Sequence, residues 1–142
     1  MSIKRKILVA VDDSDQARDA FVEAVTVAKA KEANLYLVSV IDEDILSNRE
    51  ESDYSHSLVG QRQELLNNYR QLAKNQFDFD QVNAEVFVGE PKRQIIHLLK
   101  EDPAFELIVV GATGKNARER LFMGSVSQFV VRHSPVSVLI VR

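Results

Sequence analysis

Apolar residues along the chain follow two spacings in turn, and each spacing predicts one kind of element. Unbroken apolar runs at 7–11 and 107–110 are typical of strands buried on both faces of a parallel sheet. Elsewhere apolar residues recur every three or four positions, as on the buried side of an amphipathic helix. Strands are expected at 7–11, 35–41, 82–88, 107–111 and 136–141, and helices at 17–28, 58–73, 91–99 and 125–133.

Two segments depart from these patterns. In the third strand Val82, Val86 and Val88 alternate with polar residues, which predicts a half-exposed strand at the edge of the sheet. The stretch 42–57 is rich in acids and serines and has no core pattern. A long loop or mobile lid is therefore expected there.

The order of the elements defines the expected fold class. Strand and helix alternate throughout with short connections, so an α/β fold is expected. Its core would be a single doubly wound, five-stranded parallel sheet with helices on both faces, in one domain spanning 1–142. In such folds ligands bind at the carboxyl ends of the strands, where the strand order reverses. Asp12, Val40 and the loop 111–124 should meet in that crevice.

Composition narrows the classes of function. The 142 residues are 45% hydrophobic and include no cysteine, which allows a core but neither disulfides nor zinc–thiolate sites. The sequence has no run of about eighteen apolar residues, and its first residues lead into a strand. A soluble cytoplasmic protein without membrane association is therefore expected. The net charge of −3 provides no basic surface, so nucleic acid is not expected as a partner.

Glycines form the most informative motif. Gly111 and Gly114 follow the fourth strand, and after nine intervening residues come Gly124 and Ser125. The first pair would let backbone N–H groups approach an anion, and Ser125 is a candidate N-cap of the last helix. A phosphate at that helix start would meet unpaired N–H groups and the positive end of the helix dipole. Glycines at such turns more often serve geometry, so the spacing alone does not decide.

Other segments extend the motif in a fixed order. The first strand ends in Asp12, Asp13 and Ser14, and the last helix and strand read SVSQFVVRHSPVSVLIVR. Together with the Gly-x2-Gly-x9-Gly-Ser spacing, these segments resemble the ATP-binding branch of the universal stress protein family over almost the whole chain. The resemblance implies the fold of that family, which is like that of the adenine nucleotide alpha-hydrolases.

The resemblance also implies a ligand, ATP with Mg²⁺. Ala10, Asp12 and Val40 would line the adenine and ribose side, and Asp12 could also hold the metal. The phosphates would be bound by the glycine motif and its neighbours, which are Gly111, Gly114, Lys115, Gly124, Ser125, Val126 and Ser127. Lys115 replaces an arginine that is common in the family, so the positive charge is kept but the planar guanidinium, which can donate two parallel hydrogen bonds, is lost. Asp12 could instead serve only as a helix cap.

Other functions fit parts of the sequence. Phosphoryl-accepting receiver domains also have acidic residues after the first strand, but here the third strand lacks their aspartate and the fifth their lysine. Rapid ATP turnover is not expected because there is no Walker motif and no evident general base. His97 should pack or lie at the surface, and His133 should end the last helix. Slow hydrolysis or self-phosphorylation stays open, as does a nucleotide-free dimeric scaffold or chaperone-like protein.

Assembly is expected at the last strand, which begins at Val136 and ends at Val141. It lacks the charges and internal prolines that protect a sheet edge from pairing. The resemblance implies that two such strands meet antiparallel in a homodimer. The alternative is a monomer in which Pro135 and a covering helix protect this edge. Bound ATP is then expected to act as the conformational ligand of a stress-response regulator or interaction module with an unidentified protein partner.

Overall fold

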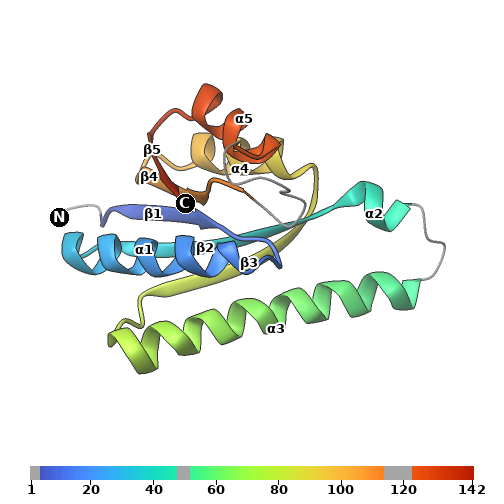
Figure 1. Cartoon of the computed structure of the whole chain (residues 1–142), viewed down its shortest axis with the longest axis horizontal. Helices are drawn as coiled ribbons and strands as arrows, with labels where there is room; N and C mark the ends of the chain where they lie inside the picture. Colours follow the sequence, from blue (N-terminus) through green and yellow to red (C-terminus); the bar gives the residue numbers. More distant parts are fainter. Residues whose placement is uncertain (1–3, 48–51, 114–122) are drawn as a thin grey trace.

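The computed structural model describes residues 4–47, 52–113 and 123–142, and its elements alternate as predicted (Figure 1). The strands are β1 (Lys6–Ala10), β2 (Asn34–Asp42), β3 (Val82–Gly89), β4 (Phe105–Gly111) and β5 (Ser137–Val141). The helices are α1 (Gln16–Lys31), α2 (Glu43–Ser47), α3 (Ser52–Phe77), α4 (Pro91–Glu101) and α5 (Ser125–His133). Over the described ranges, no helix is long and apolar enough to cross a membrane.

The strands form one parallel sheet in the order β3-β2-β1-β4-β5. The chain adds β2 and β3 on one side of β1 and then crosses over to add β4 and β5 on the other. The predicted α/β fold and doubly wound sheet are confirmed. Because the strand order reverses between β1 and β4, the carboxyl ends of these two strands border the crevice where such sheets bind ligands.

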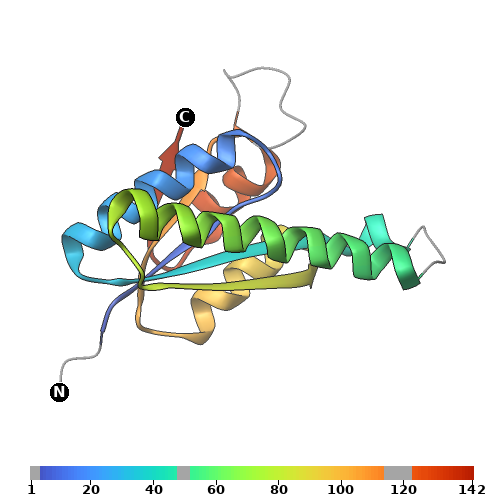
Figure 2. The same ribbon diagram turned by 90° about the horizontal axis from the view of Figure 1, so that it is seen from below.

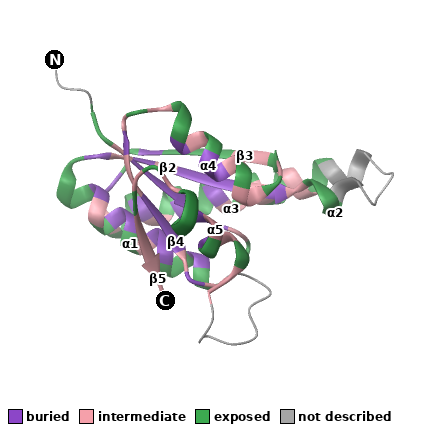
Figure 3. Ribbon diagram, turned by 90° about the horizontal axis from the view of Figure 1, so that it is seen from above, coloured by how far each residue is buried: buried purple, intermediate pink, exposed green. Residues whose placement is uncertain are grey.

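Helices cover both faces of the sheet. Figures 1 and 2 show α1 and α3 on one face and α4 and α5 on the other. In β1, Ile7 and Val9 pack with α1 and α3, Leu8 packs with α4 and α5, and all three side chains are fully buried. Figure 3 shows the burial concentrated in the strands and on the helix sides that face them. A strand covered on both faces needs an unbroken apolar run, as the sequence has here.

The structure corrects the expectation of a long loop or lid over 42–57. β2 runs to Asp42, α2 follows at once, and α3 begins at Ser52, while residues 48–51 lie outside the described part. Figures 1 and 2 show α2 and the first turns of α3 projecting beyond the sheet. A helix with no core to face needs no apolar stripe, and His56 and Ser57 in these turns are exposed. This stretch therefore lacks a core pattern because its helical turns project beyond the core, and not because it lacks helices.

β3 is an edge strand, as its alternating pattern predicts. It pairs with β2 and, among the described strands, with no other. Val82 is buried and Val86 half-buried on the side of α3, whereas Ala84 and Val88 are exposed. The alternating pattern thus identifies β3 as an edge strand, but it does not predict which of its apolar side chains α3 covers.

Candidate functional site

The carboxyl ends of β1 and β4, where a sheet of this strand order is expected to bind its ligand and which we call the crevice, have an apolar side where the sheet meets α4 and α5. Ala10 in β1, Val40 in β2 and Val126 in α5 are partly buried and pack on the same hydrophobic cluster. The end of β1 is held to β2, which carries Val40, because the Val11 amide donates to the Val38 carbonyl at 2.9 Å. The structure therefore brings together three residues that the sequence predicts to contact a nucleotide.

Asp12 follows β1 and organises the turn that leads into α1. Its Oδ1 accepts hydrogen bonds from the Ser14 amide at 2.9 Å and from the Ser14 hydroxyl at 2.5 Å. The N-cap of α1 is Asp15, and no side chain forms a hydrogen bond at that cap. Asp12 therefore closes the turn before the helix and does not cap the helix itself. The residue is half-buried at the strand end that borders the crevice.

The N-terminus of α5 lies against the end of β4. The Gly124 amide donates to the Ala112 carbonyl at 2.7 Å, and the Ala112 amide donates to the Val141 carbonyl of β5 at 2.7 Å. Gly124 is the N-cap and Ser125 the first helical residue, so the prediction of Ser125 as the N-cap is wrong by one position. The extended backbone of Gly124 leads directly into the helix without a side-chain cap. The unpaired N–H groups of the first turn are thereby placed at the crevice.

The hydroxyl of Ser127 is not oriented to donate a hydrogen bond to a phosphate. The residue is 3% exposed, and its hydroxyl oxygen lies 2.9 Å from the Ala112 carbonyl oxygen and 3.0 Å from that of Gly124. A hydroxyl has one proton, and in this structure that proton is directed to a carbonyl. Ser127 therefore fastens the helix start to β4, whereas Ser125 is exposed.

Gly111 ends β4 in a crowded place. A Cβ atom added there would lie 3.3 Å from the Thr113 carbonyl oxygen, closer than side chains usually come. Of the described glycines, none has a positive φ, so Gly111 serves a close backbone approach and not a left-handed conformation. Gly114 and Lys115 lie outside the described residues, and their part in phosphate binding stays a prediction.

Asp12 is also the residue predicted to hold Mg²⁺. Within the described ranges, no group of three or more His, Asp or Glu side chains could hold a metal ion. Magnesium in nucleotide sites commonly takes one or two carboxylates from the protein and further oxygens from the phosphates. A single carboxylate at the strand end therefore fits a metal that arrives with its nucleotide.

Ser39 and Arg62 are two residues near the crevice that sequence reasoning missed. Ser39 is 1% exposed in β2, and its hydroxyl donates to the Val11 carbonyl at 2.6 Å. Arg62 of α3 donates through Nη1 to the Ser39 oxygen at 2.7 Å. Together they link α3 to the strand end that carries Asp12. The available signals were a serine inside an apolar strand and an arginine four residues before the buried Leu66.

The histidines of α4 and α5 lie on the outside of the molecule. His97 is 62% exposed, and its Nε2 lies 2.7 Å from a Glu101 carboxylate oxygen. His133 is the last residue of α5, is exposed, and packs its ring 4.2 Å from that of Phe129. His133 thus ends the last helix as predicted, and His97 is a surface residue.

Comparison with known proteins identifies relatives along nearly the whole chain. The sequence profile of the universal stress protein family matches residues 4–142. A Staphylococcus aureus protein whose name places it among the universal stress proteins is 40% identical over 140 residues, which cover 97% of this chain and 84% of that one. The structure of universal stress protein UspA from Lactobacillus plantarum has a TM-score of 0.76 and 32% identity, with 100% of both chains covered. A universal stress protein in complex with cAMP has a TM-score of 0.70 and 26% identity, over 99% of this chain and 98% of its own.

The profile match takes in every part of the crevice. It includes the strand end at Asp12, the end of β4 and the start of α5, so the likeness does not depend on the glycine motif alone. The TM-scores of 0.76 and 0.70 show that the two solved structures share the fold of this chain. On this evidence the chain belongs to the universal stress protein family.

Proposed function

We propose that this protein binds ATP in the crevice between β1 and β4, with the adenine against Ala10 and Val40. The observation that carries the proposal is the position of α5, whose N-cap Gly124 donates to the Ala112 carbonyl at the end of β4. Phosphates at this helix start would meet unpaired N–H groups and the positive end of the dipole. Ala10 and Val40, which are apolar and partly buried on the same side, offer a surface for the purine ring.

A related protein supports an adenine nucleotide as the ligand class. The universal stress protein in complex with cAMP is 26% identical to this chain. Cyclic AMP and ATP share adenine and ribose and differ in their phosphates, so the phosphate end decides between them. In this proposal Asp12 shares the Mg²⁺ ion with the phosphates. The triphosphate contacts come from Gly111, Gly114, Lys115, Gly124, Ser125, Val126 and Ser127, with Ser127 acting through its backbone because its hydroxyl is directed to carbonyls.

Bound ATP acts in this proposal as a conformational ligand and not as the substrate of rapid turnover. His97 is exposed on the outer side of α4, and His133 lies at the opposite end of α5 from the crevice, so neither is placed as a general base. A ligand that binds only the folded form stabilises it and shifts the population of its conformers. The protein would then be a cytoplasmic stress-response regulator or interaction module whose protein partner recognises the ATP-bound form.

Calorimetric titration of nucleotide-stripped protein with ATP and MgCl₂ tests this function. Asp12→Asn is the informative variant because the amide oxygen can still accept from Ser14 while the negative charge is gone. We expect Asp12→Asn to bind ATP about tenfold more weakly than the wild type, which corresponds to the free energy of one lost hydrogen bond to a charged group. A parallel titration with cAMP measures how much of the affinity depends on the triphosphate.

Binding failure has a defined meaning. No heat, no rise in melting temperature and no co-purified nucleotide would reject ATP binding and favour the nucleotide-free dimeric scaffold or chaperone-like protein. If ATP does bind, release of phosphate from it would establish slow hydrolysis, and labelling of Ser125 would establish self-phosphorylation.

We also propose that β5 forms the interface of a homodimer. β5 pairs with β4 and, among the described strands, with no other, and Leu139 and Ile140 on its two faces are only partly buried. Antiparallel pairing with the β5 of a second copy would complete the backbone hydrogen bonds of this edge. Leu139→Lys should give monomers by light scattering, whereas Val131→Lys, at an apolar position that is 51% exposed on α5, should not. A wild-type monomer, or a Leu139→Lys protein of dimer mass, would contradict the interface.

A further inference from the structure

β3, at the sheet edge opposite β5, borders a pocket that lies outside the nucleotide crevice. The pocket has a volume of about 350 Å³. Figure 2 shows α3 and β3, the two elements that form it, running side by side. Its walls are polar on the helix side and mainly apolar on the strand side, and the lining residues are Gln63, Leu66, Asn67, Arg70, Ala84, Glu85 and Val86.

Ala84 makes room for this pocket. It stands between Val82 and Val86 on the side of β3 that faces α3, and its small side chain leaves the strand exposed at this point. Polar side chains border the opening from the helix side. Gln63, Asn67 and Arg70 are separated by four and three residues, so they form one stripe along α3.

Backbone groups of β3 point out of the sheet beside the pocket. The Leu35 amide donates to the Gln81 carbonyl at 2.9 Å, so the odd-numbered residues of this strand direct their backbone groups to β2. The direction alternates along a strand, so the N–H and C=O groups of Ala84 and Val86 point to the outer side. β3 contains no proline and pairs with β2 without a bulge, so neither device protects this edge.

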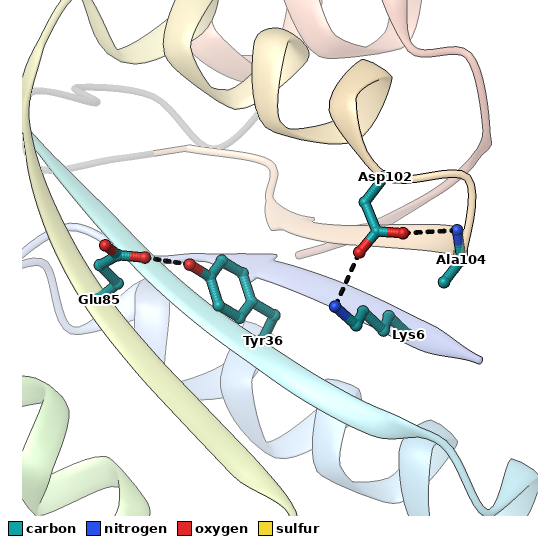
Figure 4. Close-up of polar contacts among 5 residues, drawn as sticks. All are labelled: Lys6, Tyr36, Glu85, Asp102 and Ala104. Atoms are coloured by element: carbon teal, nitrogen blue, oxygen red, sulfur yellow. Dashed lines mark hydrogen bonds and ion pairs between the residues drawn. The ribbon is translucent and has the colours of Figure 1, made fainter. Parts of the chain in front are cut away.

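Arg70 provides the charge of the pocket. Glu85 also lines it, but the Glu85 carboxylate accepts a hydrogen bond from the Tyr36 hydroxyl on the other face of the sheet (Figure 4). Arg70 is exposed, and in the part of the chain that the structure describes no acidic side chain pairs with it. Its planar guanidinium presents several donors in the geometry of a carboxylate.

We propose that α3 and β3 bind an extended, acidic peptide segment of a partner protein, which adds a strand to the edge of β3 and pairs a carboxylate with Arg70. The carboxamides of Gln63 and Asn67 can donate and accept, so they suit the other polar groups of such a segment. From residue 63 to residue 70 the stripe is about 10 Å long, the length of about three strand residues. Two alternate side chains of the peptide therefore contact it.

A second copy of this chain fits the groove less well than an acidic peptide. Pairing of two β3 strands would bring valine and alanine side chains, those of residues 82, 84, 86 and 88, to the side of α3. None of these carries a carboxylate for Arg70. Charge complementarity thus favours a partner segment with Glu or Asp at one inward position.

Amide chemical shifts measured by NMR test the groove with three capped pentapeptides, Thr-Val-Glu-Val-Thr and its Gln and Lys counterparts. The Glu peptide should shift the amides of Val82, Ala84, Val86 and Val88 and bind about tenfold more tightly than the Lys peptide. Arg70→Glu should reverse this preference. Arg93→Glu, the same charge change at an exposed site on α4, should leave the preference unchanged.

Ala84→Leu supplies the steric test, because its larger side chain would fill the space that Ala84 leaves open. This variant should lose binding of all three peptides while its ATP titration stays as in the wild type. No amide shift with any peptide, or equal binding of the Glu and Lys peptides, would overturn the proposal. A particle mass that rises with concentration in the wild type but not in Ala84→Leu would assign the edge to a second copy instead.

Discussion

Ser39 connects β1, β2 and α3 beside the crevice, so removal of its hydroxyl should lower stability by a definable amount. Ser39→Ala deletes the 2.6 Å bond to the Val11 carbonyl and the acceptor of Arg62 Nη1. Val11 is 6% exposed, and a buried polar group left without a partner costs about 1–3 kcal/mol. Arg62 is only half-buried and can turn to water, so the loss of its bond adds only the net worth of one hydrogen bond, about 0.5–1.5 kcal/mol. We expect a total loss of about 1.5–4.5 kcal/mol, or about 5–15 °C in Tm for a chain of this length.

Urea unfolding followed by far-UV circular dichroism measures this loss, and a double-mutant cycle assigns it. Arg62→Met removes the guanidinium while keeping most of the apolar stem. Because Arg62 acts through Ser39, the double variant should lose less stability than the sum of the single variants, by about 0.5–1.5 kcal/mol. The control Ser57→Ala, at an exposed position of α3, should stay within about 0.5 kcal/mol of the wild type.

Two results would refute the reasoning on Ser39. A change of less than about 0.5 kcal/mol in Ser39→Ala would mean that the Val11 carbonyl finds another partner at no cost. Additive effects of the Ser39 and Arg62 substitutions would mean that the two side chains do not act as one unit.

The structure also predicts how three further substitutions change the stability of the fold. Lys6, which donates to Asp102 Oδ2 at 2.7 Å, holds the pKa of that carboxyl below its ordinary value (Figure 4), so the pair stabilises the fold above about pH 4. The stability gap between wild type and Asp102→Asn in urea should therefore close as pH falls through the lowered pKa. Burial, helped by the hydrogen bond to Glu85 and by its charge, raises the pKa of Tyr36, so the fold favours the protonated phenol. The advantage of wild type over Tyr36→Phe should be constant below about pH 10 and shrink as pH rises towards the raised pKa; a gap that grew would contradict this. Phe21 is fully buried, so Phe21→Ala should cost about 3–5 kcal/mol and lower the urea midpoint, and a smaller loss would mean that α1 collapses into the cavity.

Local spacing was sufficient to predict most of the fold. The unbroken apolar run at 7–11 predicts a strand covered on both faces, and the alternation around Val86 predicts a strand at an edge. Both predictions hold because the spacing of apolar residues along a strand depends on which of its faces are packed. The start of α3 could not be found in this way. Its first turns project beyond the sheet, and periodicity reports a helix only where the helix has a core to face.

The sequence by itself determined the alternation of elements, the family and the residue types at the strand ends. Tertiary structure alone decided which of them meet. Ser39 and Arg62 lie 23 positions apart and form a bond only because α3 packs across β2, and the hydroxyl of Ser127 is directed to Ala112 only because α5 returns to the end of β4. The same holds for the pocket at Ala84, which depends on the placement of α3 beside β3. Hydrophobic periodicity is a property of neighbours along the chain, whereas side-chain partnerships depend on register between distant segments, which no local pattern records.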